Sequence, residues 1–269
     1  SLNSNSLYEF VVYCNCDNSE SNFVKYFTLK FTELGLKKLI YTYFVEEGTS
    51  VKTIITSKGV KHIKLLGNGS FDSNECVAIL KQSDIVVTNP PFSRFDDIVR
   101  LITNHHKKFI LLGSLDARSH KIIYEQFKSK TIFNGYSVKS GGLYYSIPSY
   151  YPLTTTTAVK IIDGVRYINI PSRWYTNFNV DTSIIPFLKT GIKFNTHNYT
   201  KFDNYDAINV SSIKLIPDNY NKPMGVPLTI FDRLNPNQFK VLAIRKGIDG
   251  KDLSINGITP FTRVIIQRV

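Results

Sequence analysis

The chain has 269 residues, 42% of them hydrophobic, enough to bury one large core or two modest ones. No apolar run approaches the length of a membrane-spanning helix and no signal peptide opens the sequence, so a membrane protein is not expected. The formal net charge is +12, and the odd number of cysteines favours reduced thiols and a cytoplasmic protein over a disulfide framework.

The first part of the chain predicts a strand, a helix and a second strand. Tyr8–Cys14 is an apolar, β-rich run. Asp17 and Glu20 form a capping-box pattern before a helix that Gly35 ends, with one apolar face made by Val24, Phe27, Phe31 and Leu34. Lys38–Phe44 is the second strand, so a βαβ unit with a parallel sheet is expected.

A hairpin and a short helix follow. Val51–Ile55 and Val60–Leu66 flank Ser57-Lys58-Gly59, which is typical of a β-hairpin. Asp72 or Ser73 then caps a helix that carries Cys76, Ile79 and Leu80. Cys14-x-Cys16 has no second ligand pair at zinc spacing, so no metal site is predicted and the cysteines are interpreted as buried small residues.

The stretch Asp84–Phe92 predicts a site. Asp84–Thr88 is a short buried strand, and Asn89-Pro90-Pro91-Phe92 follows it. Neither proline has an N–H and each fixes its own φ, so the four residues form a stiff loop that can join neither a helix nor a ladder. Ser93 with Asp96 then forms an N-cap pattern before a helix with Phe95, Ile98, Val99 and Ile102 on one face. Ligands of open α/β sheets bind at such strand ends.

The strand–helix alternation ends soon afterwards. Lys108–Leu112 predicts a strand that Gly113-Ser114 ends, with a helix after Asp116 through about Phe127. Beyond it a hairpin is expected across Asp163-Gly164, between Val159–Asp163 and Val165–Ile170. The other expected strands are Lys214–Pro217, Pro227–Phe231, Phe239–Ile244 and Arg263–Val269. We therefore expect an α/β domain, residues 1–135, and a basic, β-rich region, residues 136–269.

The two parts differ in charge. Residues 1–135 hold 17 Lys and Arg against 13 Asp and Glu, whereas residues 136–269 hold 16 against 8 and contain no glutamate. A basic second half predicts a polyanionic partner, nucleic acid before membrane, because no basic amphipathic helix stands out. The alternative is a basic protein from a lysine- and asparagine-rich proteome, and charge alone favours neither.

Asn89–Phe92 suits the activation of a planar amine for methyl transfer. The lone pair of an exocyclic amine is delocalised into its ring, which makes the nitrogen a poor nucleophile. An asparagine oxygen and the Pro90 carbonyl can each accept one of its hydrogens, which localises the lone pair on nitrogen. Phe92 offers a ring on which a flipped-out base can stack.

Asn89-Pro90-Pro91-Phe92 resembles the [Asp/Asn/Ser]-Pro-Pro-aromatic motif of S-adenosylmethionine-dependent amino-methyltransferases. The segments VVYCNCDNSESNF, GNGSF, KFILLGS, RWYTNF and MGVPLTIFDRLNPNQF are similar, in the same order, to the EcoRI-type adenine-specific DNA methyltransferase family. The resemblance runs from about Phe10 to the C-terminus. It implies a Rossmann-like class I methyltransferase sheet, S-adenosylmethionine as cofactor, double-stranded DNA as partner and a cognate restriction endonuclease.

The resemblance also implies roles for individual residues. Asn89, Pro90, Pro91 and Phe92 would grip and activate the target adenine. Arg173, Trp174, Tyr175 and Phe178 would lie near the mouth of the active site, where the aromatic rings would contact the base. The cofactor would be bound by Cys14, Asn15, Cys16, Asp17, Ser21, Asn22, Phe23, Thr42, Asn68, Gly69 and Ser70. Residues 136–269 would recognise DNA.

Two alternatives stay open. The first is a DNA-binding member of the same fold with weakened or absent catalysis, because Gly67-Asn68-Gly69 stands where the family usually has Gly-Asp-Gly. The start at Ser1 also leads us to expect that native residues precede this chain. The second is an amino-methyltransferase that acts on RNA or on a protein glutamine, because those enzymes carry the same tetrapeptide.

Overall fold

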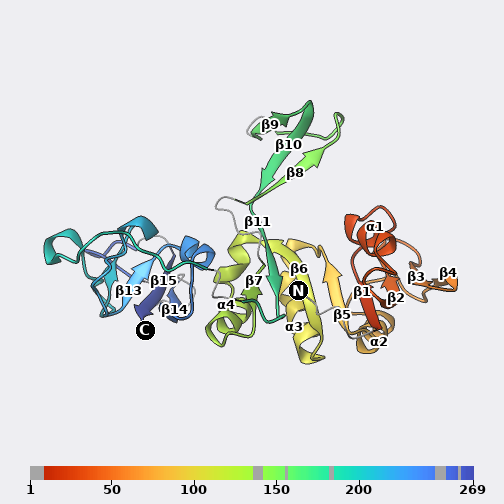
Figure 1. The fold of residues 1–269 in the computed structure, drawn as a ribbon, viewed down its shortest axis with the longest axis horizontal. Coiled ribbons are helices and arrows are strands. Elements are labelled where there is room, and N and C mark those ends of the chain that lie inside the picture. Colours follow the sequence, from red (N-terminus) through yellow and green to blue (C-terminus); the bar gives the residue numbers. More distant parts are fainter. Residues whose placement is uncertain (1–8, 136–141, 155–156, 182–184, 246–252, 260–261) are drawn as a thin grey trace. The chain divides into compact units, whose positions relative to one another are not determined.

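The computed structural model describes residues 9–135, 142–154, 157–181, 185–245, 253–259 and 262–269 (Figure 1). The chain divides into two compact units. Unit 1 comprises Ser1–Ser114 and Ser172–Phe178, and unit 2 comprises Leu115–Pro171 and Asn179–Val269. Within the described residues, none of the helices combines the length and the apolar character that crossing a membrane requires.

Unit 1 is built around one mixed β-sheet. Its strands are β1 (Phe10–Cys14), β2 (Leu36–Tyr41), β3 (Val51–Thr56), β4 (Gly59–Lys64), β5 (Ile85–Thr88), β6 (Lys108–Ser114) and β11 (Ser172–Thr176). They lie in the order β4-β3-β2-β1-β5-β6-β11. The four central strands β2, β1, β5 and β6 are parallel, and β3, β4 and β11 extend the sheet antiparallel to their neighbours.

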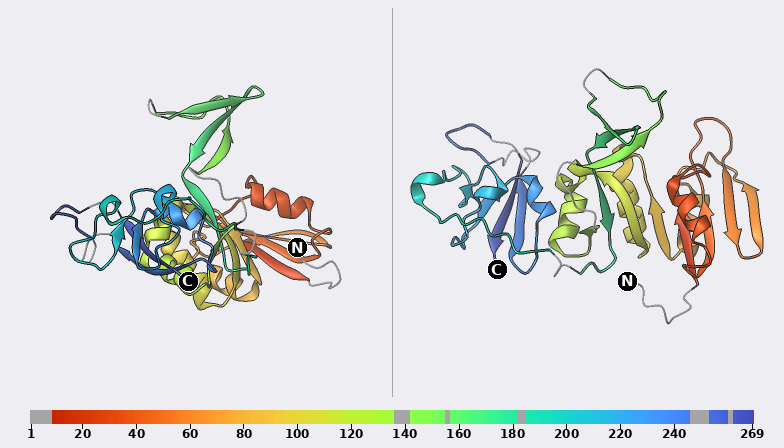
Figure 2. Two further views of the ribbon diagram at one scale, coloured as in Figure 1. Left: turned by 60° about the vertical axis from the view of Figure 1, so that its left-hand side comes forward. Right: turned by 45° about the horizontal axis from the view of Figure 1, so that its top comes forward.

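Helices cover both faces of this sheet. They are α1 (Asn22–Leu29), α2 (Asn74–Gln82) and α3 (Phe95–Asn104), the last preceded by the 3₁₀ turn η1 (Phe92–Arg94). α1 covers one face, and α2 and α3 cover the other (Figure 2). Burial on both sides explains why β1 and β5 are continuous apolar runs rather than alternating ones. The expected βαβ unit with a parallel sheet is confirmed.

The start of α3 is held in the core. Phe95 is fully buried and packs against the Tyr175 ring of β11, with the ring centres 5.0 Å apart. Gly113 on β6 lies so close that a Cβ atom there would overlap the Phe95 ring. Phe95 therefore fits beside β6 only because residue 113 is a glycine.

Unit 2 contains shorter elements. One sheet has four strands in the order β12-β13-β15-β14, and side chains of α4 pack against its core. A second, antiparallel sheet has three strands in the order β8-β10-β9. The elements of this unit are η2 (Leu115–Ser119), α4 (Lys121–Lys128), β7 (Phe133–Asn134), β8 (Leu143–Ile147), β9 (Val159–Ile162), β10 (Val165–Ile170), η4 (Thr196–Asn198), β12 (Ile208–Asn209), η5 (Ile213–Leu215), β13 (Met224–Val226), η6 (Leu228–Asp232), β14 (Phe239–Arg245) and β15 (Arg263–Arg268).

Several expectations about helix ends were wrong. The N-cap of α1 is Ser21, whose hydroxyl accepts the N–H of Phe23, not the pair Asp17 and Glu20. α1 ends at Leu29 and the chain then turns up to Gly35, although Phe27, Phe31 and Leu34 do pack on the core as predicted. Ser93 does not cap α3, because η1 intervenes and Arg94 holds the cap position without a side-chain bond.

Two predicted strands of unit 2 are also wrong. The segments Lys214–Pro217 and Pro227–Phe231 hold the 3₁₀ turns η5 and η6 instead. Both runs are short and contain a proline, so their apolar content reflects burial and not ladder pairing. The hairpin across Asp163-Gly164 is confirmed, and both turn residues have positive φ (50° and 76°), as a tight hairpin turn requires. The expected division into an α/β domain, residues 1–135, and a basic, β-rich region, residues 136–269, stays a prediction.

Candidate active site

A cavity of about 720 Å³ opens at the carboxyl ends of the parallel strands of unit 1. Three of its walls follow β1, β2 and β5, and the fourth is the turn that precedes α2. The residues that line it are Asn15, Cys16, Asp17, Asn18, Ser21, Tyr43, Phe44, Gly69, Ser70, Phe71, Asn89, Pro90, Pro91, Phe92 and Arg94. The cavity therefore joins the two segments that the sequence singled out, one after β1 and one after β5.

Asn15 is the most unusual residue of the first wall. It is only 1% exposed, yet neither its amide nitrogen nor its amide oxygen has a hydrogen-bond partner within the described residues. The backbone around it is fixed, because Thr42 donates its N–H to the Cys14 carbonyl and Asp17 donates its N–H to the Thr42 carbonyl, at 3.1 and 3.0 Å. A buried amide without partners costs free energy unless a ligand satisfies it.

Asp17, two residues later, differs from Asn15 because the protein forms hydrogen bonds to both of its side-chain oxygens. Its carboxylate accepts the Ser21 hydroxyl at 2.6 Å through Oδ1 and the Thr88 hydroxyl at 2.6 Å through Oδ2. A backbone hydrogen bond from Asn89 reaches the same carboxylate. Burial raises the pKa of Asp17 above its ordinary value, although these three hydrogen bonds oppose the shift.

The loop Asn89–Phe92 forms the wall after β5. Asn89 is exposed and Pro90 is buried, while the Phe92 ring is 39% exposed. Pro91 turns the chain into η1, where its carbonyl accepts the N–H of Arg94 at 3.0 Å. The loop thus keeps one amide side chain and one aromatic ring at the cavity, with a buried ring between them, as its two prolines predicted.

The fourth wall is a tight turn that only glycine can make. Gly69 has φ +78°, and a Cβ atom there would overlap the Tyr43 carbonyl oxygen and approach the Ser50 hydroxyl oxygen to 2.7 Å. Glu75 holds the start of this turn by accepting the N–H groups of Leu66 and Gly67. The turn is therefore fixed against the segment that follows β2.

Arg94 connects two walls of the cavity. Its Nη2 lies 2.9 Å from Asp72 Oδ2, its Nε lies 2.7 Å from Asp97 Oδ2, and its guanidinium lies over the Phe71 ring at 4.8 Å. These groups are half-exposed, so each pair contributes little stability alone. The arrangement orients Arg94 across the mouth between η1 and the turn before α2.

The cysteines near the cavity are neutral thiols. Burial, followed by the nearby Asp17 carboxylate, raises the pKa of Cys16 to about 12 and raises that of Cys14 as well. A nucleophilic cysteine would need the opposite shift, towards the thiolate. Cys14 and Cys76 are buried small residues, as predicted, whereas Cys16 is only partly buried and lines the cavity.

Some predicted cofactor residues do not line the cavity. Cys14 and Thr42 are buried beneath it, and the Thr42 hydroxyl contacts the Tyr13 hydroxyl at 2.7 Å. Asn68 uses its side-chain oxygen to accept the Ser70 N–H at 3.2 Å, which stabilises the turn. Asn22 and Phe23 belong to the first turn of α1. These residues support the cavity walls.

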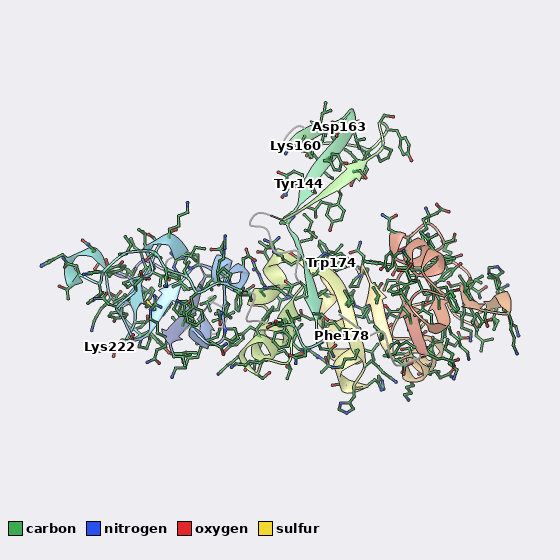
Figure 3. All side chains as sticks on the ribbon, in the orientation of Figure 1. Tyr144, Lys160, Asp163, Trp174, Phe178 and Lys222 are labelled. Carbon is green, nitrogen blue, oxygen red and sulfur yellow. The ribbon has the colours of Figure 1, made fainter. Side chains whose placement is uncertain are left out.

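The four residues predicted at the active-site mouth all lie on or just after β11 (Figure 3). Trp174 is half-buried and meets the Phe23 ring edge-on at 5.7 Å, whereas Arg173 is 1% exposed. Tyr175 is fully buried and donates its hydroxyl to the Ser114 carbonyl at 2.7 Å. Phe178 lies near Lys108, at the amino end of β6 and so at the sheet edge opposite the cavity. Base contacts by Tyr175 and Phe178 are not supported by these positions.

Sequence reasoning missed Tyr43, Phe44, Asn18, Phe71 and Arg94. A signal for the first two was present, since they directly follow the apolar run that forms β2, at a carboxyl strand end. They were absorbed into the predicted strand Lys38–Phe44, which in the structure ends at Tyr41. Phe71 and Arg94 carry no local signal, because their contact with each other spans α2 and β5.

Comparison with known proteins places this site in a family. Residues 3–263 match the family described as "Adenine-specific methyltransferase EcoRI". The chain is 38% identical to the type II methyltransferase M.EcoRI of Escherichia coli, covering 96% of this chain and 85% of that protein. It is 42% identical to M.MpnI of Mycoplasma pneumoniae, over 86% and 74% of the two chains, and 37% identical to M.MgeORF184P of Mycoplasma genitalium, over 96% and 87%.

No solved structure matches the fold. The family match spans nearly the whole chain and includes every residue that lines the cavity. The mixed α/β architecture with its large central sheet is consistent with a methyltransferase fold. The chain belongs to the EcoRI family of adenine-specific methyltransferases.

Proposed function

We propose that this protein is a DNA adenine-N6 methyltransferase that uses S-adenosylmethionine. One observation carries the proposal. A single cavity is lined both by the buried Asn15 amide, which has no hydrogen-bond partner among the described residues, and by the loop Asn89–Phe92. The relatives support the choice of reaction, since all three are named type II methyltransferases. The central strand order β2-β1-β5-β6 supports a Rossmann-like sheet with its ligand at the carboxyl edge.

The cavity fits the cofactor. Its volume of about 720 Å³ lies within the range of ligand pockets, about 300–1,000 Å³. The Asn15 amide can donate a hydrogen bond to a polar ligand through its nitrogen and accept one through its oxygen. Gly69 keeps the turn before α2 packed against the segment that follows β2. Tyr43 and Phe44 offer rings for an adenine base. When bound, S-adenosylmethionine supplies an electrophilic methyl group.

The loop after β5 prepares the acceptor amine. The Asn89 side-chain oxygen and the Pro90 carbonyl would each accept one N6 hydrogen of a flipped-out adenine, which localises the nitrogen lone pair. The Phe92 ring, 39% exposed, would stack on the base. The proposal assigns no base role to Asp17, whose two carboxylate oxygens accept the Ser21 and Thr88 hydroxyls.

The surplus of basic residues in 136–269 is proposed to bind DNA. One face of the β8–β10–β9 sheet suits that role, because register places Tyr144, Lys160 and Tyr167 on the same face. Lys160 lies over the Tyr144 ring at 5.6 Å, and Tyr144 is 58% exposed (Figure 3). Such aromatic and cationic groups are typical of nucleic-acid surfaces. A cognate restriction endonuclease is proposed from the type II relatives.

The position of Asn68 weakens the main argument for a catalytically inactive relative. Asn68, which replaces the family's usual aspartate, accepts the Ser70 N–H and does not line the cavity. An aspartate at position 68 would accept the same hydrogen bond. The substitution therefore lies in a turn and leaves the residues that line the cavity unchanged.

The direct test is to incubate duplex DNA with the protein and methyl-labelled S-adenosylmethionine, and to digest the product to nucleosides. Label in N6-methyladenine is expected. Label in 5-methylcytosine, or no label with protein shown to bind the cofactor, would contradict the proposal. A parallel incubation with RNA and with protein substrate, each in the same salt, separates DNA from the other amine substrates.

A further inference from the structure

The Asp17 carboxylate holds together two segments that are far apart in sequence. Ser21 belongs to its own loop, but Thr88 lies 71 residues away, at the last position of β5. Thr88 is fully buried and Asp17 is 6% exposed, so solvent does not compete for this hydrogen bond. The residue that follows Thr88 is Asn89, whose backbone also bonds Asp17.

The prolines extend the effect of this anchor. Pro90 restricts Asn89 to extended backbone and fixes its own φ. Once Thr88 and the Asn89 backbone are held, few backbone torsions remain to redirect the Asn89 amide and the Pro90 carbonyl. The direction of the two acceptors therefore depends on a carboxylate in the loop after β1.

Asp17 differs in this respect from Asn15. Both lie in the same loop and line the same cavity, but Asn15 has open hydrogen-bonding capacity and Asp17 has both oxygens engaged by the protein. The hydrogen bonds of Asp17 therefore join segments of the protein, a role that the Asn15 amide does not have.

We propose that Asp17 and Thr88 are positioning residues, which aim the Asn89 amide and the Pro90 carbonyl through the hydrogen bond between the Thr88 hydroxyl and Asp17. The inference rests on the proposed function and deepens it. It predicts that the loop after β1 contributes to the methyl-transfer rate as well as to cofactor binding.

The test is Thr88→Val, which keeps the branched shape of the side chain and removes the hydroxyl. The methyl-transfer rate under saturating cofactor and DNA should fall about tenfold to a hundredfold, since displacement by about 1 Å costs up to that much. KM for DNA and the dissociation constant for cofactor should stay within about threefold, because no group that binds them is removed. Thr88→Ser restores the donor and should recover most of the rate.

The matched control is Thr53→Val. Thr53 is another buried strand threonine, 3% exposed, whose hydroxyl bonds the His62 ring at 3.0 Å in the β3–β4 hairpin, away from the cavity lining. It should leave the methyl-transfer rate unchanged. If Thr88→Val does not fold, Thr88→Cys, with its weaker donor, replaces it and should still lower the rate.

Two outcomes are kept apart. Wild-type protein that makes no N6-methyladenine contradicts the proposed function. Wild-type protein that is active, with a folded Thr88→Val or Thr88→Cys variant equally fast, overturns the positioning role. A loss of rate that Thr88→Ser does not restore, or that comes with equal loss of cofactor affinity, overturns it too.

Discussion

Two buried asparagines, one in each unit, differ in how the protein satisfies their amide groups. Asn15 of unit 1 is 1% exposed and Asn235 of unit 2 is 2% exposed. Asn235 donates to the Ile185 carbonyl at 2.6 Å and accepts the Asn237 N–H at 2.8 Å. Asn15 has neither bond within the part of the chain that the structure describes.

The difference lies in what each amide is for. An amide that the protein satisfies holds two segments of backbone together, and its loss leaves buried groups without partners. An amide that the protein leaves open, at the wall of a cavity, costs stability and is useful only to a ligand. The two side chains are equally buried but differ in their hydrogen bonds, from which we propose a structural role for Asn235 and a ligand-binding role for Asn15.

The largest expected effect is on stability, and it comes from a buried ion pair of unit 2. Arg118 and Asp232 form an ion pair at 2.6 Å, with side chains 1% and 7% exposed. Arg118→Ala should lower the free energy of unfolding by about 3–5 kcal/mol, because Asp232 loses its buried cation. Urea denaturation measures this. The double variant Arg118→Met/Asp232→Leu should recover much of the loss, and an unchanged midpoint in Arg118→Ala would contradict the structural role.

The next effect concerns the exposed amide at the cavity. Asn89→Ala should lower the methyl-transfer rate by about a hundredfold or more, as removal of one preorganised polar group does elsewhere, with DNA binding largely intact. The control is Asn219→Ala in unit 2, whose side chain accepts the Phe194 N–H at 2.6 Å. It should leave the rate unchanged. Equal loss of rate and DNA affinity in Asn89→Ala would argue against the assigned role.

Leucine variants of Asn15 and Asn235 test the comparison between the two amides. Asn15→Leu should weaken S-adenosylmethionine binding about tenfold, equivalent to about 1.4 kcal/mol, without lowering the melting temperature. Asn235→Leu should lower the free energy of unfolding by about 1–3 kcal/mol and leave the cofactor affinity of the folded protein unchanged. Calorimetry and thermal melting check both. Destabilisation by Asn15→Leu with unaltered cofactor affinity would reverse the assignment of Asn15.

The smallest effect is in the pH dependence of two carboxylates. Burial raises the pKa of Asp17 above 3.8, with Cys14 and Cys16 nearby as neutral thiols. At Asp218 burial also acts to raise the pKa. The N–H groups of Thr190 and Gly191 outweigh it, with help from Arg268, so that its pKa falls below 3.8.

The two carboxylates should change the stability of the fold in opposite directions as the pH falls. Asp17 binds its proton more tightly in the folded state, so wild type should gain stability relative to Asp17→Asn as pH falls from neutral towards 3.8. Asp218 contributes stability above 3.8 that is lost as pH falls through its lower folded pKa, so the deficit of Asp218→Asn should shrink on acidification. Urea titrations from about pH 3 to pH 7 compare them, and parallel curves for the two variants would contradict the assignment.

Local signals predicted much of unit 1. β1 and β5 are short apolar runs, the β3–β4 hairpin has Gly59 at its turn with φ +127°, and two prolines define the loop at Asn89–Phe92. Each of these features is specified by residues adjacent in sequence. The cavity wall after β1 was predicted from the family resemblance and not from a local signal.

Contacts between distant residues explain the rest. Asp17 and Glu20 matched a capping box, but the Asp17 carboxylate is drawn to Thr88, 71 residues away, and Ser21 caps α1 instead. Phe178 was placed at the active-site mouth by the family resemblance, together with Arg173, Trp174 and Tyr175. The antiparallel pairing of β11 with β6 carries it to the opposite edge, and no local pattern states that pairing.

The segment between Thr88 and Phe95 is fixed at both ends, since both residues are fully buried. Adding or removing one residue here would pull Thr88 from Asp17 or Phe95 from the space beside Gly113. Selection should therefore act on the length of this segment as strongly as on its residue types. The exposed residues 46–49 between β2 and β3 carry no such constraint, so insertions and deletions among relatives should gather there.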